Sequence, residues 1–347
     1  MTVEGTDDGP AVTRMVAAVD DTWDVRETTE IEAGGNEIVR VTVETSDGTR
    51  ECVLKTSAGG GGALDAEARV LRLLDGETSV PVPEVYGVVD DHPDLPAPFF
   101  LVEHLDGTVL PGDASEISID ELTSYVRTVG RHLGDVHSLD AFDGYGPVVT
   151  AHRVDPDEAG GTTPLARESG LTIPEPETEW EPRLAATAES MLERLGETRF
   201  ADLVAPIRER TAEQRRRLDL SGSPVLARID HRPANLVVDP ESRAVTGVLD
   251  WAIVRTTHRE YELACAEQGF CGLLSLDADR RERLRDALYD GYETEHDRPV
   301  DDRYAERRRL YQLVFLTANM TWASDWITPD IAAEVERDYR ALVDELL

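Results

Sequence analysis

The feature that most constrains the fold of this 347-residue chain is a change of hydrophobic pattern near residue 115. Before that point apolar and polar residues alternate, and in 38–44 the side chains of Val39, Val41 and Val43 share one face of a predicted strand. After it, apolar residues recur at helical spacing. Because a chain of this length usually forms more than one core, we expect a β-rich part followed by a mainly helical part, an α+β fold.

The first hundred residues predict a small antiparallel sheet with one helix inserted after its third strand. The turn segments EAGGN before 38–44 and SDG after it are hairpin signals. The helix over 63–76 carries an apolar stripe, and Gly76 is expected to cap its C-terminus. The expected segments are a short helix at 12–19, strands at 38–44, 51–55, 80–89 and 97–107, and the helix at 63–76.

The rest of the chain predicts helices with one interruption by strands. Between the first two helices, the Gly-, Pro- and acid-rich stretch 141–179 is expected to be a long loop with little regular structure. Short buried strands are expected within 224–251, and helices from there to the C-terminus. The first helices are expected at 119–139, 181–196 and 200–218.

The chain carries 70 acidic and 35 basic residues, a formal net charge of −35 that is spread along its length. A surface this negative repels nucleic acid and anionic lipid, so neither is expected as a partner. The acidity favours adaptation to high salt, where charges are screened within a few ångströms. The cysteines Cys52, Cys265 and Cys271 fit no metal or redox motif, which is typical of a cytoplasmic protein. No apolar run reaches about 18 residues, so no membrane span is expected.

Lys55 is the only lysine among the 35 basic residues, and it ends the apolar run ECVLK. On the helix that follows, Glu67 lies within the apolar stripe formed by Leu64, Leu71 and Leu74. A carboxylate that faces the interior is costly unless it is paired, and Lys55 is the nearest basic candidate. The alternative is that Glu67 lies at the edge of the stripe and reaches solvent.

A second group of polar residues interrupts the apolar stretch that begins with PVLARI. Asp230 and Asn235 are five positions apart on a predicted loop, and Asp250 follows 15 positions later, at the end of a buried strand. Their oxygens suit Mg²⁺, although they could equally shape a turn and cap it. In chain order with Lys55 and Glu67, however, they form the constellation that phosphoryl transfer requires.

These residues resemble the aminoglycoside phosphotransferase family of kinase-like small-molecule kinases. The family's catalytic stretch reads HGDxxxxN, followed by a strand ending in IDW or LDW. This chain reads RIDHRPANLVVD and then VLDW at the family's 15-residue step; LDAEARVLRLL, VPVPEVYGV, APFFLVEHLDG and VGRHLGDVHSLD resemble further segments of the family. The resemblance implies a bilobal, protein-kinase-like fold, with a nucleotide-binding lobe at 1–104 and a helical lobe at 105–347 that contains the catalytic loop at 224–251.

The resemblance also implies ATP and Mg²⁺ as cofactors. The phosphate acceptor would be the hydroxyl of a small molecule, such as an aminoglycoside, an amino alcohol or a sugar. It assigns the catalytic base to Asp230 and the metal ligands to Asn235 and Asp250. The residues that would contact or position the nucleotide are Lys55, Glu67, the loop glycines Gly34 and Gly35, and the hinge residues Glu103, His104 and Leu105.

One departure from the family pattern directly precedes the predicted base, where the usual histidine and glycine are here Arg228 and Ile229. That histidine is usually a support residue, so chemistry can survive its loss. The alternative is a nucleotide-binding pseudokinase or regulatory module with weakened catalysis. A protein kinase is disfavoured, because Glu262 in the resuming helix lies only 12 positions after Asp250, too few for an activation segment that orders a peptide. A third alternative is a metal-dependent hydrolase, which would bind metal without affinity for ATP.

The remaining polar residues favour structural roles. His137 ends an apolar helix and is expected in the core, whereas His231 is expected to be exposed to solvent. The arginine-rich segments 215–218 and 307–310 are expected on solvated helix faces, where they balance acids.

Overall fold

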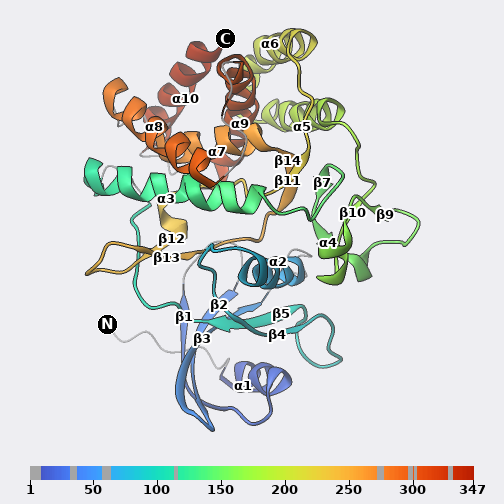
Figure 1. The fold of residues 1–347 in the computed structure, drawn as a ribbon, viewed down its shortest axis with the longest axis vertical. Helices are drawn as coiled ribbons and strands as arrows, with labels where there is room; N and C mark the ends of the chain where they lie inside the picture. The colour runs from blue at the N-terminus through green and yellow to red at the C-terminus, as the bar shows by residue number, and fades with distance from the viewer. Residues whose placement is uncertain are drawn as a thin grey trace.

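The computed structural model describes residues 9–31, 37–56, 64–112, 116–271, 277–295, 300, 303–326 and 331–347. Figure 1 shows a sheet formed by the N-terminal part of the chain, a larger helical part, and helix α2 (Leu64–Glu77) between them. The architecture confirms the expected α+β fold, in which an antiparallel sheet precedes a mainly helical region.

The N-terminal sheet is antiparallel, with the strand order β1-β2-β3-β5-β4. Side chains alternate across it, so Leu54 faces one side and Lys55 the other. Leu54 joins a core with α1 (Gly9–Val19), whereas Phe100, opposite Lys55, packs with α2. The alternation therefore directs Lys55 toward α2. The strands are β1 (Asp24–Ile31), β2 (Glu37–Thr45), β3 (Gly48–Thr56), β4 (Val85–Val89) and β5 (Phe99–Glu103).

Helix α3 (Ile119–His137) begins the helical part and crosses α8 (Ala278–Glu295) at close range. A Cβ on Gly130 would lie 2.1 Å from the carbonyl oxygen of Leu288, and one on Gly291 would lie 2.0 Å from that of Arg127. Only glycine allows the two backbones to approach so closely. The other helical segments are α5 (Trp180–Leu195), η3 (Ala201–Leu203), α6 (Val204–Arg217), η4 (Pro233–Asn235), α7 (Arg259–Cys271), α9 (Tyr304–Trp326) and α10 (Ala332–Leu346).

Two small antiparallel sheets carry the loops that contain the candidate residues. Strand β11 (Pro224–Ala227) ends where the loop with Asp230 begins, and β14 (Arg255–His258) begins where the loop with Asp250 ends. Because these strands are antiparallel, with Ala227 opposite Arg255, both loops leave the sheet at the same end of the two strands. The remaining strands are β7 (Gly146–Pro147), beside β14, and β6 (Thr108–Val109), β12 (Leu236–Val238) and β13 (Val245–Val248), which form the second sheet.

The structure corrects the expectation of a loop at 141–179. That segment contains the sheet β8-β10-β9, together with η2 and the short helix α4. Strands of two to four residues are too short for alternation to show in the sequence. The bounds are β8 (Val149–Thr150), η2 (Ala151–Arg153), β9 (Ala159–Gly160), α4 (Pro164–Glu168) and β10 (Leu171–Pro174).

Two further local expectations are wrong. Strand β14 lies where only helices were expected, because its sequence RTTH contains no large apolar residue. Helix α2 continues past Gly76 to Glu77, so Gly76 is not its cap. Instead Thr78 closes the helix by donating its N–H and its hydroxyl to the carbonyl oxygen of Leu74, at 2.9 and 2.7 Å.

The two arginine-rich segments differ in burial. In α6, Arg216 is exposed, as expected for a solvated face. In α9 the expectation is wrong, because Arg307 is 7% exposed and donates to both oxygens of buried Glu260, at 2.5 and 2.7 Å. The neighbouring Arg308 pairs with Glu267, which is also buried. These pairs join α9 to α7.

Within the described ranges, no helix is both long and apolar enough to cross a membrane. Cys52 and Cys265 are buried free thiols, and burial raises the pKa of Cys52 to about 12. Both thiols are therefore held in the protonated form.

Candidate active site

The lysine and the glutamate singled out in the sequence meet between β3 and α2. Lys55 Nζ lies 2.6 Å from Glu67 Oε1, and the two side chains are 17% and 1% exposed. Glu67 does not reach solvent, so the edge position considered as an alternative is wrong. Trp251, the neighbour of Asp250, donates its backbone N–H to the same oxygen at 3.3 Å. Among the described residues, Glu67 Oε2 is buried and has no partner.

The first turn of α2 is tied to the helical part through Asp65. Its fully buried carboxylate accepts hydrogen bonds from Thr150 Oγ1 at 2.6 Å and from Arg153 Nε at 2.5 Å. Asp65 and Glu67 belong to the same helical turn, so these charge-assisted bonds also fix Glu67 relative to the helical part. The sequence pattern does not signal this contact, because Thr150 lies 85 positions from Asp65.

Asp65, Asp90 and His152 bring potential metal ligands within 4.8 Å of one another. Arg69, however, donates to both oxygens of Asp90, at 2.9 and 2.6 Å, and Arg153 engages Asp65. Burial would raise the pKa of Asp90, but its hydrogen bond from Arg69 is the largest influence and holds that pKa below its usual value. The cluster is therefore an ion-pair network rather than a metal site.

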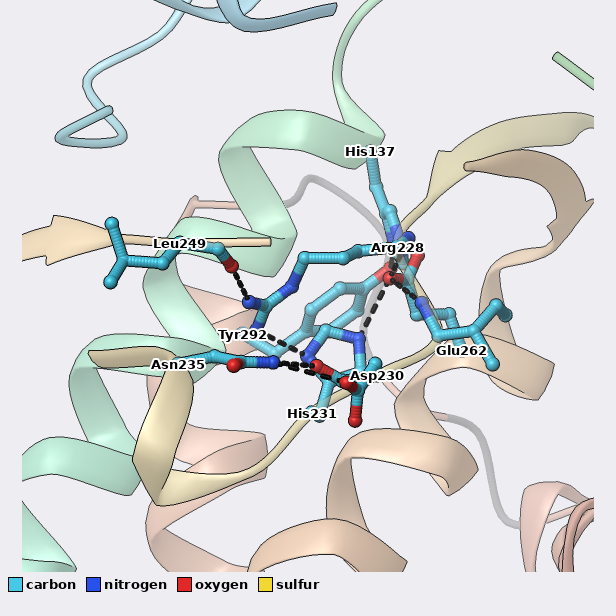
Figure 2. A network of polar contacts seen from close by, with 9 residues as sticks. His137, Arg228, Asp230, His231, Asn235, Leu249, Glu262 and Tyr292 are labelled. Atoms are coloured by element: carbon cyan, nitrogen blue, oxygen red, sulfur yellow. Dashed lines mark hydrogen bonds and ion pairs between the residues drawn. The ribbon is translucent and has the colours of Figure 1, made fainter. Parts of the chain in front are cut away.

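Asp230 and Asn235 lie together on the loop that follows β11. The Asn235 Nδ2 group donates to the backbone oxygen of Asp230 at 3.0 Å and to its Oδ2 at 3.2 Å, as Figure 2 shows. Arg232 Nη2 lies 2.9 Å from the same Oδ2, and the Asp230 side chain is 38% exposed. Ile229 has a φ of +70°, a left-handed conformation that is strained for a β-branched residue. This is the position at which the resembled family has glycine.

Asp250 lies next to this loop because Leu249 donates its N–H to the Asn235 carbonyl oxygen at 2.9 Å. The φ of Asp250 is +61°, which aspartate tolerates better than most residues. Since Asn235 uses its Nδ2 as a donor toward Asp230, its Oδ1 remains available as a ligand atom. An amide oxygen and a carboxylate are hard ligands, so these two residues fit a Mg²⁺ ion.

Glu262 is the centre of a buried polar network beside the loop that contains Asp230 (Figure 2). Its Oε1 accepts the Arg228 N–H at 2.7 Å and His231 Nε2 at 2.8 Å, and its Oε2 accepts His137 Nε2 at 2.9 Å. Burial alone would raise the pKa of Glu262, but the bonds from His137 and His231 outweigh it and hold that pKa far below its usual range. No pattern in the sequence marks Glu262 as the centre of a network, because its donors are scattered along the chain.

The arginine that replaces the family's histidine is buried and links the two candidate loops. Arg228 Nη1 donates to the carbonyl oxygen of Leu249 at 2.6 Å, directly before Asp250, and Nη2 lies 3.2 Å from His231 Nδ1. Arginine can only donate, so His231 Nδ1 accepts and its proton is on Nε2, which donates to Glu262. His231 is 4% exposed, and the expectation that it reaches solvent is wrong.

The predicted hinge lies at the end of β5. The Glu103 N–H donates to the carbonyl of Glu84 at 2.9 Å, and the His104 N–H donates to that of Glu51 at 3.2 Å. In the described part of the chain, the N–H of Leu105 has no acceptor, which leaves it available to a ligand. The loop glycines Gly34 and Gly35 lie outside the described residues.

Comparisons with known proteins bear on the family and the fold of the chain. A sequence profile described as the phosphotransferase enzyme family matches residues 29–308. The structure is similar to that of a putative aminoglycoside phosphotransferase from Ralstonia eutropha JMP134, with 17% identity, a TM-score of 0.66, and 97% and 96% of the two chains covered. It is also similar to a thermostable mutant of aminoglycoside phosphotransferase APH(4)-Ia in complex with ADP and hygromycin B, with 15% identity, a TM-score of 0.62, and 96% and 98% covered.

A curated relative matches over a shorter stretch. Probable acyl-CoA dehydrogenase IBR3 of Arabidopsis thaliana is 24% identical over 192 residues, which are 55% of this chain. The match spans only 21% of that plant protein.

Proposed function

The chain belongs to the phosphotransferase enzyme family, and from this premise we propose that it transfers the γ-phosphate of ATP to a hydroxyl group of a small molecule, with Mg²⁺ as cofactor. The expected acceptors are an aminoglycoside, an amino alcohol, a sugar or a similar alcohol. One observation carries the proposal: a partly exposed aspartate, Asp230, is held by Asn235 at the sheet edge that also bears Asp250.

Asp230 is suited to the role of catalytic base. Both Asn235 and Arg232 contact its Oδ2, so Oδ1 has no partner among the described residues and can accept a proton from an incoming hydroxyl. As the acceptor oxygen bonds to the γ-phosphorus, the bond from that phosphorus to the bridging oxygen breaks and ADP leaves. The hydroxyl proton passes to Asp230, which completes the balance.

Lys55 would bind the phosphates of the nucleotide. Its ammonium group is held by Glu67 and is still partly exposed, so it can contact phosphate oxygens without losing its partner. Because Trp251 donates to the same Glu67 oxygen, the lysine and the loop that contains Asp250 are kept in register. The free N–H of Leu105 and the carbonyl of Glu103 would bond the adenine edge.

Asn235 and Asp250 would hold the metal. Bound Mg²⁺ supplies neutralisation of the phosphate charge that builds up during transfer. The positive φ of Asp250 and the bond between Leu249 and Asn235 are the features of this chain that bring the two ligands together. The hinge at the end of β5 marks the boundary that we propose between the nucleotide-binding lobe, 1–104, and the helical lobe, 105–347. The buried free thiols suit a cytoplasmic location.

The unusual Arg228 and Ile229 do not remove any group that the reaction needs. Arg228 supplies a hydrogen bond from the loop that contains Asp230 to Leu249. The backbone at Ile229 keeps the left-handed conformation that glycine usually provides. The pseudokinase alternative therefore depends on the measured activity rather than on a missing residue.

The test is transfer of phosphate from Mg·ATP to a panel of metabolite alcohols and antibiotics at high KCl, with GTP as a second donor. We expect transfer to at least one class of alcohol and a loss of about 10²- to 10⁴-fold on Asp230→Asn. Asp279→Asn, an exposed aspartate in the first turn of α8, is the matched control and should leave the rate unchanged. ATP binding without transfer to any acceptor would favour the pseudokinase.

A further inference from the structure

Two arginines at the edge of the candidate site lack a carboxylate partner. Arg255 is the first residue of β14, and Arg183 lies in the first turn of α5; both are half-buried. Among the described residues, neither side chain forms an ion pair or a hydrogen bond, and Arg255 Nε is buried with no acceptor. Groups with this much burial normally have a partner.

Arg255 lies where the two candidate loops leave the sheet. Its cross-strand partner Ala227 is three residues before Asp230, and Asp250 is five residues before Arg255 itself. Directly opposed residues of antiparallel strands project to the same face. Ala227 belongs to an apolar cluster with Tyr261, so Arg255 shares the face of the sheet that this cluster covers.

Arg183 approaches the same place from α5. It lies one turn after Trp180, whose ring is 5.3 Å from that of Tyr261. Burial, and then the charge of Arg255, lower the pKa of Arg183; the exposed Glu177 acts in the opposite direction, and among the described residues it forms no ion pair with Arg183. Arg183 and Arg255 are thus both placed beside the cluster that contains Trp180, Ala227 and Tyr261.

Half-buried arginines without an ion pair are unexpected in a chain with so many acidic residues. Acidic residues outnumber basic ones 70 to 35, and half-buried arginines elsewhere, such as Arg69 and Arg308, have found a carboxylate. Half-buried cations that form no ion pair lose hydration without direct compensation. Arg232 differs from these two, because its guanidinium lies 2.9 Å from the Asp230 carboxylate and is paired with it. Two guanidinium groups that form no ion pair disfavour a cationic ligand beside them and suit an anion.

We propose that Arg183 and Arg255 bind an anionic group of the acceptor, a carboxylate or a phosphate, while a hydroxyl of the same molecule reaches Asp230. Planar guanidinium groups bind such oxyanions with paired hydrogen bonds. The inference rests on the proposed function and narrows it to alcohols that carry an acidic group, such as hydroxy acids or phosphorylated alcohols.

Binding of simple anions tests the site without any turnover. The full chain is saturated with Mg²⁺ and a non-hydrolysable ATP analogue, which fills the nucleotide phosphate site, and is titrated with malonate or inorganic phosphate at constant KCl. We expect Arg183→Gln and Arg255→Gln each to weaken binding at least fivefold. Exposed Arg216→Gln is the control and should match the wild type. Binding of malonate alone identifies a carboxylate as the group, and binding of phosphate alone a phosphate. Equal affinity in all variants, or no binding to the wild type, overturns the proposal.

Turnover with matched acceptors separates this inference from the proposed function. Glycerate and glycerol differ by one carboxylate, and glycerol phosphate supplies the phosphate counterpart. We expect faster transfer to an acidic member than to glycerol or kanamycin, and a KM for it that rises at least fivefold in Arg255→Gln with a smaller change in kcat. Preference for the neutral or cationic acceptors contradicts the inference while it supports the kinase. If no acceptor reacts, the kinase proposal fails, and the anion titration still decides whether the arginine site exists.

Discussion

Glu67 and Glu262 are both about 1% exposed, yet the hydrogen bonds that their carboxylates accept differ. Glu262 receives donors at both oxygens, from Arg228, His137 and His231. Glu67 receives Lys55 and a backbone N–H at one oxygen, and its other oxygen has no partner among the described residues. Both oxygens of Glu262 accept hydrogen bonds within the protein, whereas Glu67 has an oxygen that can still accept one.

This difference distinguishes a carboxylate that supports the structure, Glu262, from one that lies beside the proposed nucleotide site, Glu67. Buried carboxylates are costly unless they are fully hydrogen-bonded, so an incomplete one persists where a ligand is expected. Glu67 holds a partly exposed lysine that can still meet phosphate oxygens. Glu262 holds the loop that contains Asp230 through Arg228 and His231.

The largest effect that separates the two carboxylates is on folding. Glu262→Gln removes the negative charge to which Arg228, His137 and His231 donate, so each of these buried hydrogen bonds loses its charge assistance. We expect the free energy of unfolding to fall by about 3 kcal/mol. In Glu67→Gln the NH₂ can occupy the unpartnered side, and we expect a fall of about 1 kcal/mol or less.

Denaturant unfolding of both variants at the same high KCl concentration measures this contrast. Equal losses in the two proteins would show that the count of donors does not distinguish these carboxylates.

Sequence alone predicted the Lys55–Glu67 side of this comparison but not the Glu262 side. Alternation in β2 and β3 and the apolar stripe of α2 are strong local signals, and a charge inside such a stripe is conspicuous. Glu262 lies in the first turn of a helix, where an acid is ordinary, and its donors come from residues 137, 228 and 231. Long-range partners of this kind cannot be read from periodicity.

The same limit explains other differences. Strand β14 is set by pairing with β11 and β7, and the small sheet within 141–179 is formed by strands of two to four residues that pair with one another, too short for a pattern to show. The unusual Arg228 was visible as a departure from a motif, but its bond to Leu249 depends on the fold.

A smaller effect is expected from pH. Burial is the main cause that lowers the pKa of His231, and the charge of Arg228 adds to it although Glu262 acts in the opposite direction. The unfolded chain therefore binds the proton more readily, so this contribution to stability is complete above about pH 6.5 and is lost as the pH falls below it. His258 and His132, with pKa values of about 4, act in the same direction.

Unfolding measured from pH 7 to pH 5 checks the sign. Each extra proton bound by the unfolded state lowers the free energy of unfolding by up to about 1.4 kcal/mol per pH unit. His231→Gln keeps a donor toward Glu262 without titrating, and should flatten part of this slope. A slope identical to that of the wild type would mean that His231 does not titrate on unfolding.

The smallest effect is expected at Asp65, which anchors the turn of α2 that carries Glu67. Asp65→Asn weakens the bond to Arg153 and loosens α2 from the helical part. We expect a three- to tenfold rise in the KM for the nucleotide, equivalent to about 1 kcal/mol, with little change in kcat. Asp94→Asn, which removes an exposed charge, is the matched control. An unchanged KM would show that the Asp65 contact does not position Glu67.

The most direct test of the proposed active site is the rate of Lys55→Arg, a change that keeps the charge of the only lysine in the chain. A compact ammonium fits between Glu67 and the phosphates, whereas the larger planar guanidinium requires a paired acceptor. We predict that kcat/KM falls by two or more orders of magnitude, roughly 3 kcal/mol, while the free energy of unfolding changes by less than about 1 kcal/mol. A folded variant with a rate near that of the wild type would contradict the assignment of Lys55 to phosphate binding.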